Sequence, residues 1–147
     1  MTEDLLHATV SVRGVILNSR GKVLTLQRTS DHEWELPGGR LGRGEPTLEG
    51  LQREIHEETA LSAEVDRIVA ANSWVNGEEQ GRFAVHYRCY TSERIVELSE
   101  EHTDSAWVLP KETAHILREP QTAAVHAATT PTEPNSEVID RSSLAHD

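Results

Sequence analysis

Residues 53–58, Arg-Glu-Ile-His-Glu-Glu, constrain the fold of this chain more than any other segment. Side chains three and four positions apart share one face of a helix, so Glu54, Glu57 and Glu58 are expected to converge. Three like charges on one face repel each other. A hard divalent cation removes that repulsion, because carboxylate oxygens suit Mg²⁺ or Mn²⁺. A solvated acidic helix face explains the same residues, so the run alone leaves both interpretations open.

The preceding stretch, residues 34–45, contains four glycines, which let the backbone approach a ligand closely. Pro46 then presets φ, and Thr47 is a suitable cap for a helix that runs to about Thr59. The predicted unit is a glycine-rich loop followed by a helix whose carboxylates project beside the loop. This arrangement favours a metal site over an acidic surface.

Together the loop and the helix resemble the signature of the Nudix hydrolase family, G-x5-E-x7-R-E-U-x-E-E-x-G-U, in which U is a bulky apolar residue. The matching positions are Gly39, Glu45, Arg53, Glu54, Ile55, Glu57, Glu58 and Leu61. One defined position departs, because Ala60 replaces the usual glycine. A glycine after a helix often adopts the left-handed conformation, in which alanine costs about 1–2 kcal/mol. Either Ala60 bears that cost or the helix ends differently, and neither outcome removes a metal ligand.

The resemblance implies an α/β fold, a Nudix-type α/β/α sandwich with a mixed β-sheet. It also implies metal-dependent hydrolysis, with Mg²⁺ or Mn²⁺, of a nucleoside diphosphate linked to another group. The implied metal ligands are the Gly39 carbonyl and the carboxylates of Glu54, Glu57 and Glu58. Glu54 is in addition a candidate base for the attacking water, and Arg53 and Glu45 are expected to fix the helix and the loop through ion pairs.

Further candidates lie outside the signature. In the family, an acidic residue in a late loop often adds a metal ligand or serves as the base, and Glu101, with Glu100 as second choice, is the candidate here. Arg28, at the end of a predicted strand, is placed to meet substrate phosphate, although a surface cation explains it equally well. Gly38 and Trp74 are the other substrate-binding candidates, Trp74 as an aromatic edge of the pocket.

The remaining chain alternates between strand and helix patterns. Strands are predicted at 8–17, 22–28, 63–71, 82–91, 95–98 and 106–109, the first two forming a hairpin. Helical segments are predicted from Lys111 and at 121–128. One domain, residues 1–128, is expected, followed by a flexible tail at 129–147 that is rich in Thr, Pro and Ser.

A net charge of −11 argues against a surface that coats nucleic acid, which needs clusters of Lys and Arg. Neither a signal peptide nor a membrane span is apparent in the sequence. The single cysteine, Cys89, excludes an internal disulfide, so a reducing cytoplasm is expected. The family resemblance makes a homodimer possible.

The substrate is narrowed by marks that family subgroups carry downstream of the signature. The proline typical of ADP-ribose hydrolases and the tyrosine typical of dinucleoside polyphosphate hydrolases are both missing around residues 76–79. The asparagine of enzymes that clear oxidised guanine nucleotides is replaced by Arg118. By elimination, a nucleoside triphosphate cleaved to a monophosphate and pyrophosphate is predicted. ADP-ribose or a nucleotide sugar is the alternative, and a non-catalytic nucleotide-binding regulator is disfavoured because the signature carboxylates are all present.

Overall fold

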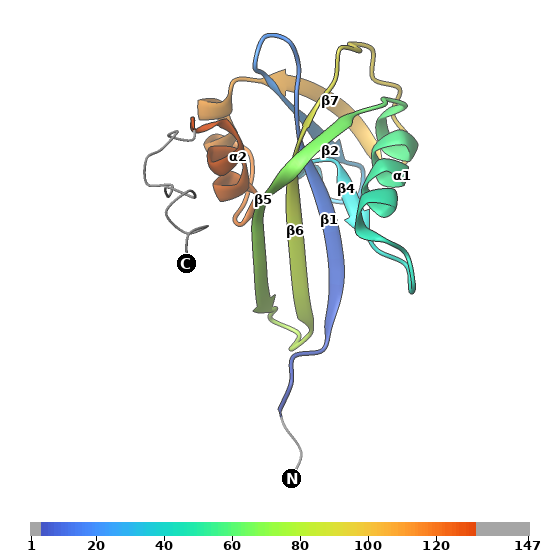
Figure 1. The fold of residues 1–147 in the computed structure, drawn as a ribbon, viewed down its shortest axis with the longest axis vertical. Coiled ribbons are helices and arrows are strands. Elements are labelled where there is room, and N and C mark those ends of the chain that lie inside the picture. Colours follow the sequence, from blue (N-terminus) through green and yellow to red (C-terminus); the bar gives the residue numbers. More distant parts are fainter. Residues whose placement is uncertain (1–3, 132–147) are drawn as a thin grey trace, which may run out of the picture.

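Seven strands form one mixed sheet with a helix on either side of it (Figure 1), as described for residues 4–131 in a computed structural model. The elements are β1 (Ala8–Leu17), β2 (Val23–Arg28), β3 (Trp34–Glu35), β4 (Gly38–Arg40), α1 (Thr47–Thr59), β5 (Glu64–Val75), β6 (Gly81–Tyr90), β7 (His102–Val108), a 3-10 helix (Pro110–His115) and α2 (Gln121–Thr129). The predicted α/β class with a mixed sheet is confirmed. None of the helices in this described part of the chain is long and apolar enough to cross a membrane.

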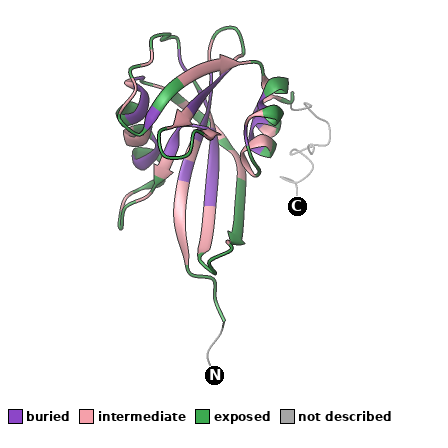
Figure 2. Cartoon of the chain, turned by 180° about the vertical axis from the view of Figure 1, so that it is seen from behind, coloured by how far each residue is buried: buried purple, intermediate pink, exposed green. Residues whose placement is uncertain are grey.

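Strand β1 organises the sheet, because it pairs with β6, β4 and β2. It runs parallel to β6 over ten residue pairs and antiparallel to β4 at residues 11–13. β5 lies antiparallel to β6, and β2 pairs antiparallel with both β3 and β7. The far ends of β1, β5 and β6 extend beyond the helices, and Figure 2 shows that buried residues gather instead where the helices cover the strands.

Alternate residues of β1 pack against the two helices. On the α1 side the core includes Val12, Ile16, Leu51 and Ile55, and on the α2 side it includes Val15, Leu17, Ala124 and Val125. Because side chains alternate across a strand, Arg13 shares the α2 side with Val15. The alternation of side chains along β1 therefore decides which polar residues of the sheet can line a site between β1 and α2.

Several boundaries differ from those predicted. Residues 95–98 form no strand: Ile95 is exposed, and the segment is tied down by the Glu97 N–H, which donates to the Thr59 carbonyl. β7 begins four residues before the predicted position, because its polar first half pairs with β2. β5 likewise continues to Val75 through its pairing with β6. The predicted hairpin between β1 and β2 is limited to one register pair, Leu17 with Val23.

The two ends of α1 show how the signature folds locally. Ala60 has φ 62° and ψ 12°, and its N–H donates to the His56 carbonyl at 2.9 Å, so alanine keeps the left-handed cap. At the other end, the prediction of Thr47 as cap is wrong, since Pro46 occupies that position and no side chain caps the helix. The Thr47 Oγ1 accepts a hydrogen bond from the Tyr87 hydroxyl at 3.0 Å instead.

The domain boundary at residue 128 stays a prediction. α2 continues through Thr129, and most of the predicted tail, residues 132–147, lies outside the described residues.

Candidate active site

A cavity of about 650 Å³ lies on the α2 side of β1, where β4 and β6 meet residues of α1 and the start of α2. Carboxylates and guanidinium groups line it together. The carboxylates are Glu35, Glu54, Glu58, Glu101 and Glu119, and the guanidinium groups are Arg13, Arg28, Arg40, Arg82 and Arg118. Arginine binds phosphate directly, whereas carboxylates approach phosphate only through a bridging cation. The lining therefore suits a polyphosphate held together with a metal.

Glu58 is the most buried carboxylate of α1, with 2 % of its surface exposed. Its Oε1 accepts a hydrogen bond from the Gly38 N–H at 2.9 Å, which joins the helix to the glycine-rich loop. Burial raises the pKa of Glu58 to about 8, and the neighbouring carboxylates of Glu54 and Glu35 add to this shift. A buried carboxylate among other carboxylates is the arrangement that a bound divalent cation stabilises.

Glu54 lies directly against the loop. A Cβ on Gly39 would come within 2.5 Å of the Glu54 carboxyl carbon and 2.6 Å of both its oxygens. A side chain at position 39 would therefore displace the Glu54 carboxylate from the loop. Burial raises the pKa of Glu54, and the Glu57 and Glu101 carboxylates raise it further, while Arg53 opposes the shift.

Arg53 holds the helix and the loop together. Its Nε donates to Glu45 Oε2 at 2.7 Å and its Nη2 donates to Glu45 Oε1 at 3.0 Å, a two-bond pair. Its Nη1 lies 3.2 Å from Glu54 Oε1 and 3.1 Å from Glu57 Oε2. Glu45 Oε1 also accepts the Gly42 N–H at 2.9 Å, and the hydrogen bonds from Arg53 lower the pKa of Glu45 to about 2. This network positions Glu54 beside Gly39.

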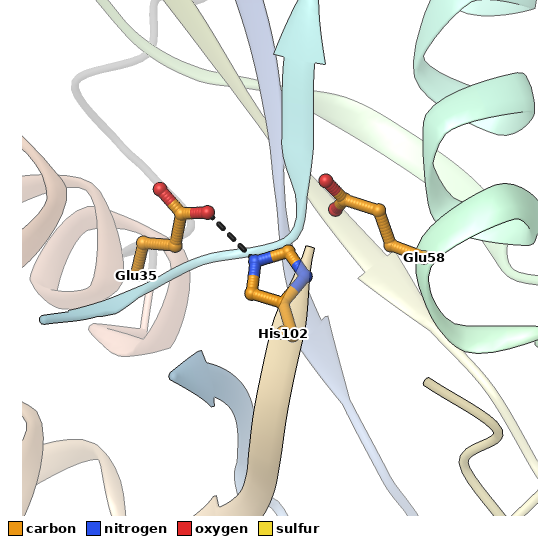
Figure 3. Close-up of side chains that lie close together, drawn as sticks. All are labelled: Glu35, Glu58 and His102. Carbon is orange, nitrogen blue, oxygen red and sulfur yellow. Dashed lines mark hydrogen bonds and ion pairs between the residues drawn. The ribbon is translucent and has the colours of Figure 1, made fainter. Parts of the chain in front are cut away.

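A second group of ligating side chains surrounds Glu58. The His102 Nε2 lies 2.8 Å from Glu35 Oε2, and Figure 3 shows Glu58 reaching from α1 toward this pair. Ligand atoms of all three buried residues lie within 4.8 Å of one another. Burial alone would raise the pKa of Glu35, but the hydrogen bond with His102 and the charge of Arg13 bring it below the ordinary value.

Sequence reasoning missed Glu35 and His102. Glu35 stands next to Trp34 at the start of the glycine-rich stretch, and His102 follows the candidate Glu101, but neither residue occupies a defined position of the signature. Only the pairing of β2 with both β3 and β7 brings these residues together, although they lie 67 positions apart in the chain.

The cavity contains most, but not all, of the predicted site residues. Gly38, Gly39, Glu54 and Glu58 line it, as do Arg28, Trp74 and Glu101. Arg28 is also held by Asp31, whose Oδ1 accepts its Nε–H at 2.9 Å. Arg53, Glu45 and Glu57 are not among the lining residues, and the Glu57 carboxylate is exposed beside Arg53. Their predicted roles stay predictions.

Known proteins are similar to this chain in both fold and sequence. A NUDIX domain model matches residues 7–131. A MutT-like protein of Streptomyces ambofaciens is 34% identical over 118 residues, which are 80% of this chain and 74% of that protein. The crystal structure of a MutT protein from Methanosarcina mazei Go1 superposes with a TM-score of 0.71 at 26% identity, covering 83% of this chain and 91% of that one. A C. elegans Ap4A hydrolase superposes with a TM-score of 0.73 at 18% identity, covering 82% and 94%.

These similarities define a hydrolase of the α/β class with a carboxylate-rich cavity, and the chain belongs to the Nudix family. As a Nudix hydrolase, it acts on nucleoside diphosphate derivatives. Enzymes of this family depend on a divalent metal, and the donors at hand fit one: the oxygens of Glu54 and Glu58 are the hard ligands that such ions prefer.

Proposed function

We propose that this Nudix hydrolase cleaves a nucleoside triphosphate to the nucleoside monophosphate and pyrophosphate, with Mg²⁺ or Mn²⁺. The observation that supports the proposal best is the cavity that combines the carboxylates of α1 with five arginines. Such a lining provides both a cation site and direct ligands for a triphosphate. The identity to a MutT-like protein and the missing marks of other subgroups support the same assignment.

In this proposal Glu54, Glu58 and the Gly39 carbonyl hold the metal, and Glu57 is a further ligand. A divalent cation held there would supply positive charge to the polyphosphate and would lower the pKa of the attacking water. Glu54 or Glu101 accepts the proton of that water, since both line the cavity. Arg28 and the Gly38 backbone bind phosphate, Trp74 borders the base, and Arg53 with Glu45 positions Glu54.

ADP-ribose or a nucleotide sugar is the second candidate. The same cavity supports it, because the metal site and the arginines act on any diphosphate linkage. We further propose that the enzyme works in the cytoplasm on small nucleotides, without nucleic acid and without a membrane. A homodimer and a catalytically inactive regulator are lesser alternatives, and the retained carboxylates argue against the regulator.

Product release across a panel of substrates tests the proposal. The four nucleoside triphosphates, ADP-ribose and a nucleotide sugar are incubated with and without Mg²⁺, and pyrophosphate, inorganic phosphate and the nucleoside monophosphate are measured separately. We expect metal-dependent release of pyrophosphate from at least one triphosphate. Release of inorganic phosphate alone would contradict the assigned cleavage position, and hydrolysis restricted to ADP-ribose or the sugar nucleotide would establish the second candidate.

Variants of α1 test the metal site in the same assay. Glu57→Gln and Glu58→Gln remove one carboxylate each and are expected to lower turnover by at least roughly 100-fold, with the fold retained. Glu49→Gln is the matched control, because Glu49 is an exposed glutamate in the first turn of the same helix. Undiminished Mg²⁺-dependent turnover in Glu58→Gln refutes the assigned site.

A further inference from the structure

His86 is a buried polar side chain that nothing in the proposed reaction uses. It has no exposed surface, and neither Nδ1 nor Nε2 hydrogen-bonds another residue of the described chain. A buried polar group without a partner costs about 1–3 kcal/mol, and most native proteins therefore avoid one. An apolar residue of similar size would pack in this place at lower cost. The imidazole thus indicates a partner supplied from outside the chain.

The partner can only arrive through the cavity. In β6, His86 is in register with Arg13 of β1 and with Ala70 of β5, so it lies on the sheet face that lines the cavity, together with Ala84. The small side chains of Ala84 and its register partner Ser11 fill little of the space beside it. The imidazole therefore borders the cavity, but both ring nitrogens are covered, so a ligand that reaches them must displace neighbouring side chains, as is common on binding.

Two kinds of ligand are disfavoured by the surroundings. Burial, reinforced by the charge of Arg13, lowers the pKa of His86 to about 4, so the ring is uncharged at neutral pH and is no anchor for phosphate. A metal is disfavoured because, among the described residues, the cluster of at least three ligating side chains is Glu35, Glu58 and His102, and His86 is not part of it. A neutral imidazole has one N–H donor and one nitrogen acceptor, which suits an uncharged polar ligand.

Two neighbours in the lining complete the recognition surface. Gln121 is oriented by the Leu36 N–H, which donates to its Oε1 at 2.7 Å, so its amide nitrogen is the end left for a ligand. Trp74 lies on the same sheet face, partly exposed at the cavity. Trp74 is in register with Arg82, four residues along β6 from His86, so an aromatic face and the polar groups border different parts of one cavity, as a nucleotide with its flat base requires.

We propose that His86, together with Gln121, hydrogen-bonds the polar edge of the nucleobase and so determines which base the enzyme prefers. This inference rests on the proposed function to the extent that the ligand is a nucleotide. It adds a specificity residue that lies outside the signature and outside the metal site. The cost of burying His86 without a protein partner is then offset when the base binds.

Binding without hydrolysis tests this proposal independently of the reaction. The probes are the four nucleoside 5′-monophosphates, the matching 2′-deoxy compounds and ribose 5-phosphate, measured by titration calorimetry. ¹⁵N-labelled histidine reports the His86 ring by NMR. We expect one base to bind at least about 10-fold more tightly than the others, the range of one good hydrogen-bonded contact, and to shift the His86 ring nitrogens.

Three variants make the test selective. His86→Leu is expected to reduce the preference between bases to below about 3-fold, to leave the affinity for ribose 5-phosphate unchanged, and to melt at a higher temperature than the wild type. His86→Gln keeps a donor and an acceptor and is expected to retain part of the preference, which also covers the case that the leucine variant does not fold. His126→Leu, which removes an exposed histidine of α2, is the control and is expected to change nothing.

Base preference unchanged in His86→Leu overturns the proposal, as do His86 nitrogens that no nucleotide shifts. A selective loss of discrimination between ribose and 2′-deoxyribose overturns it in favour of a sugar contact. Nucleotide binding with this pattern but no triphosphate hydrolysis would refute the proposed reaction and leave the role of His86 standing. Triphosphate hydrolysis with equal affinity for all bases would support the proposed reaction and refute the role of His86.

Discussion

Ala60 offers a direct test of how the signature glycine acts, through the replacement Ala60→Gly. The residue keeps φ 62° although it carries a Cβ, and this conformation costs alanine about 1–2 kcal/mol relative to glycine. Two effects oppose the stability that Ala60→Gly gains when this conformational cost is removed. Glycine makes the unfolded chain more flexible, which costs about 0.4–1 kcal/mol, and the half-buried methyl group contributes a few tenths of a kcal/mol.

With the central value of each contribution, Ala60→Gly is expected to stabilise the folded protein by about 0.5 kcal/mol. A chain of this length gains roughly 2–4 °C in Tm for each kcal/mol, so Ala60→Gly is expected to raise the Tm by about 1–2 °C. Turnover is expected to stay within about twofold of the wild type, because the amide of residue 60 and every candidate ligand remain in place.

Calorimetry and urea unfolding measure the effect, and Ala127→Gly is the matched control. Ala127 lies in α2 with an ordinary helical conformation, so the same substitution there is expected to lower stability by about 1 kcal/mol. The two alanine-to-glycine changes must therefore differ in sign. A fall in Tm in both variants would refute the reasoning, and a large rise in the activity of Ala60→Gly would show that the cap controls the chemistry.

The free energy of unfolding is expected to depend on pH through the titration of His86. Its pKa is lowered to about 4 in the folded protein from 6.5 in the unfolded chain, so its contribution to the free energy of unfolding is complete above pH 6.5 and is lost as the pH falls toward 4. The loss amounts to about 3 kcal/mol, by the usual conversion of 1.36 kcal/mol per pH unit. Urea unfolding at several pH values should therefore show that the free energy of unfolding of His86→Leu falls less steeply with decreasing pH than that of the wild type. Parallel curves for the two proteins would exclude this contribution of His86. Arg53→Lys replaces the two-bond pair with Glu45 by a point charge, and we expect roughly a 10-fold fall in kcat with KM and Tm nearly unchanged. A change in KM alone would place Arg53 at the substrate instead.

That two carboxylates of α1 lie beside the glycine-rich loop could be predicted from spacing. Glu54 and Glu58 are four residues apart and share one face of α1, and the loop before the helix meets that face. The same geometry separates the third carboxylate. At about 100° per residue, Glu57 and Glu58 lie on opposite flanks of Glu54, so Glu58 is buried while Glu57 turns toward Arg53. The sequence analysis expected all three carboxylates to converge, but the helix geometry places Glu57 and Glu58 in different surroundings.

The strand errors have a common physical origin. The first half of β7 is polar and was not predicted, because its pairing partner β2 is distant in sequence and period-2 patterns reveal only strands with one apolar face. Residues 95–98 have the apolar composition of a strand, but no neighbouring strand pairs with them. Backbone pairing is a property of two segments, and one segment alone does not determine it.

By itself the sequence determined the family, the α/β class and the loop-helix unit that carries the carboxylates, because these depend on residues fewer than thirty positions apart. Tertiary structure alone decided that Glu35 meets His102, that five arginines line the same cavity as the carboxylates, and that His86 is buried beside this cavity without a partner among residues 4–131. Burial and hydrogen bonding depend on what the sheet brings from distant strands. These contacts govern the pKa values of the site and, through His86, the proposed choice of base.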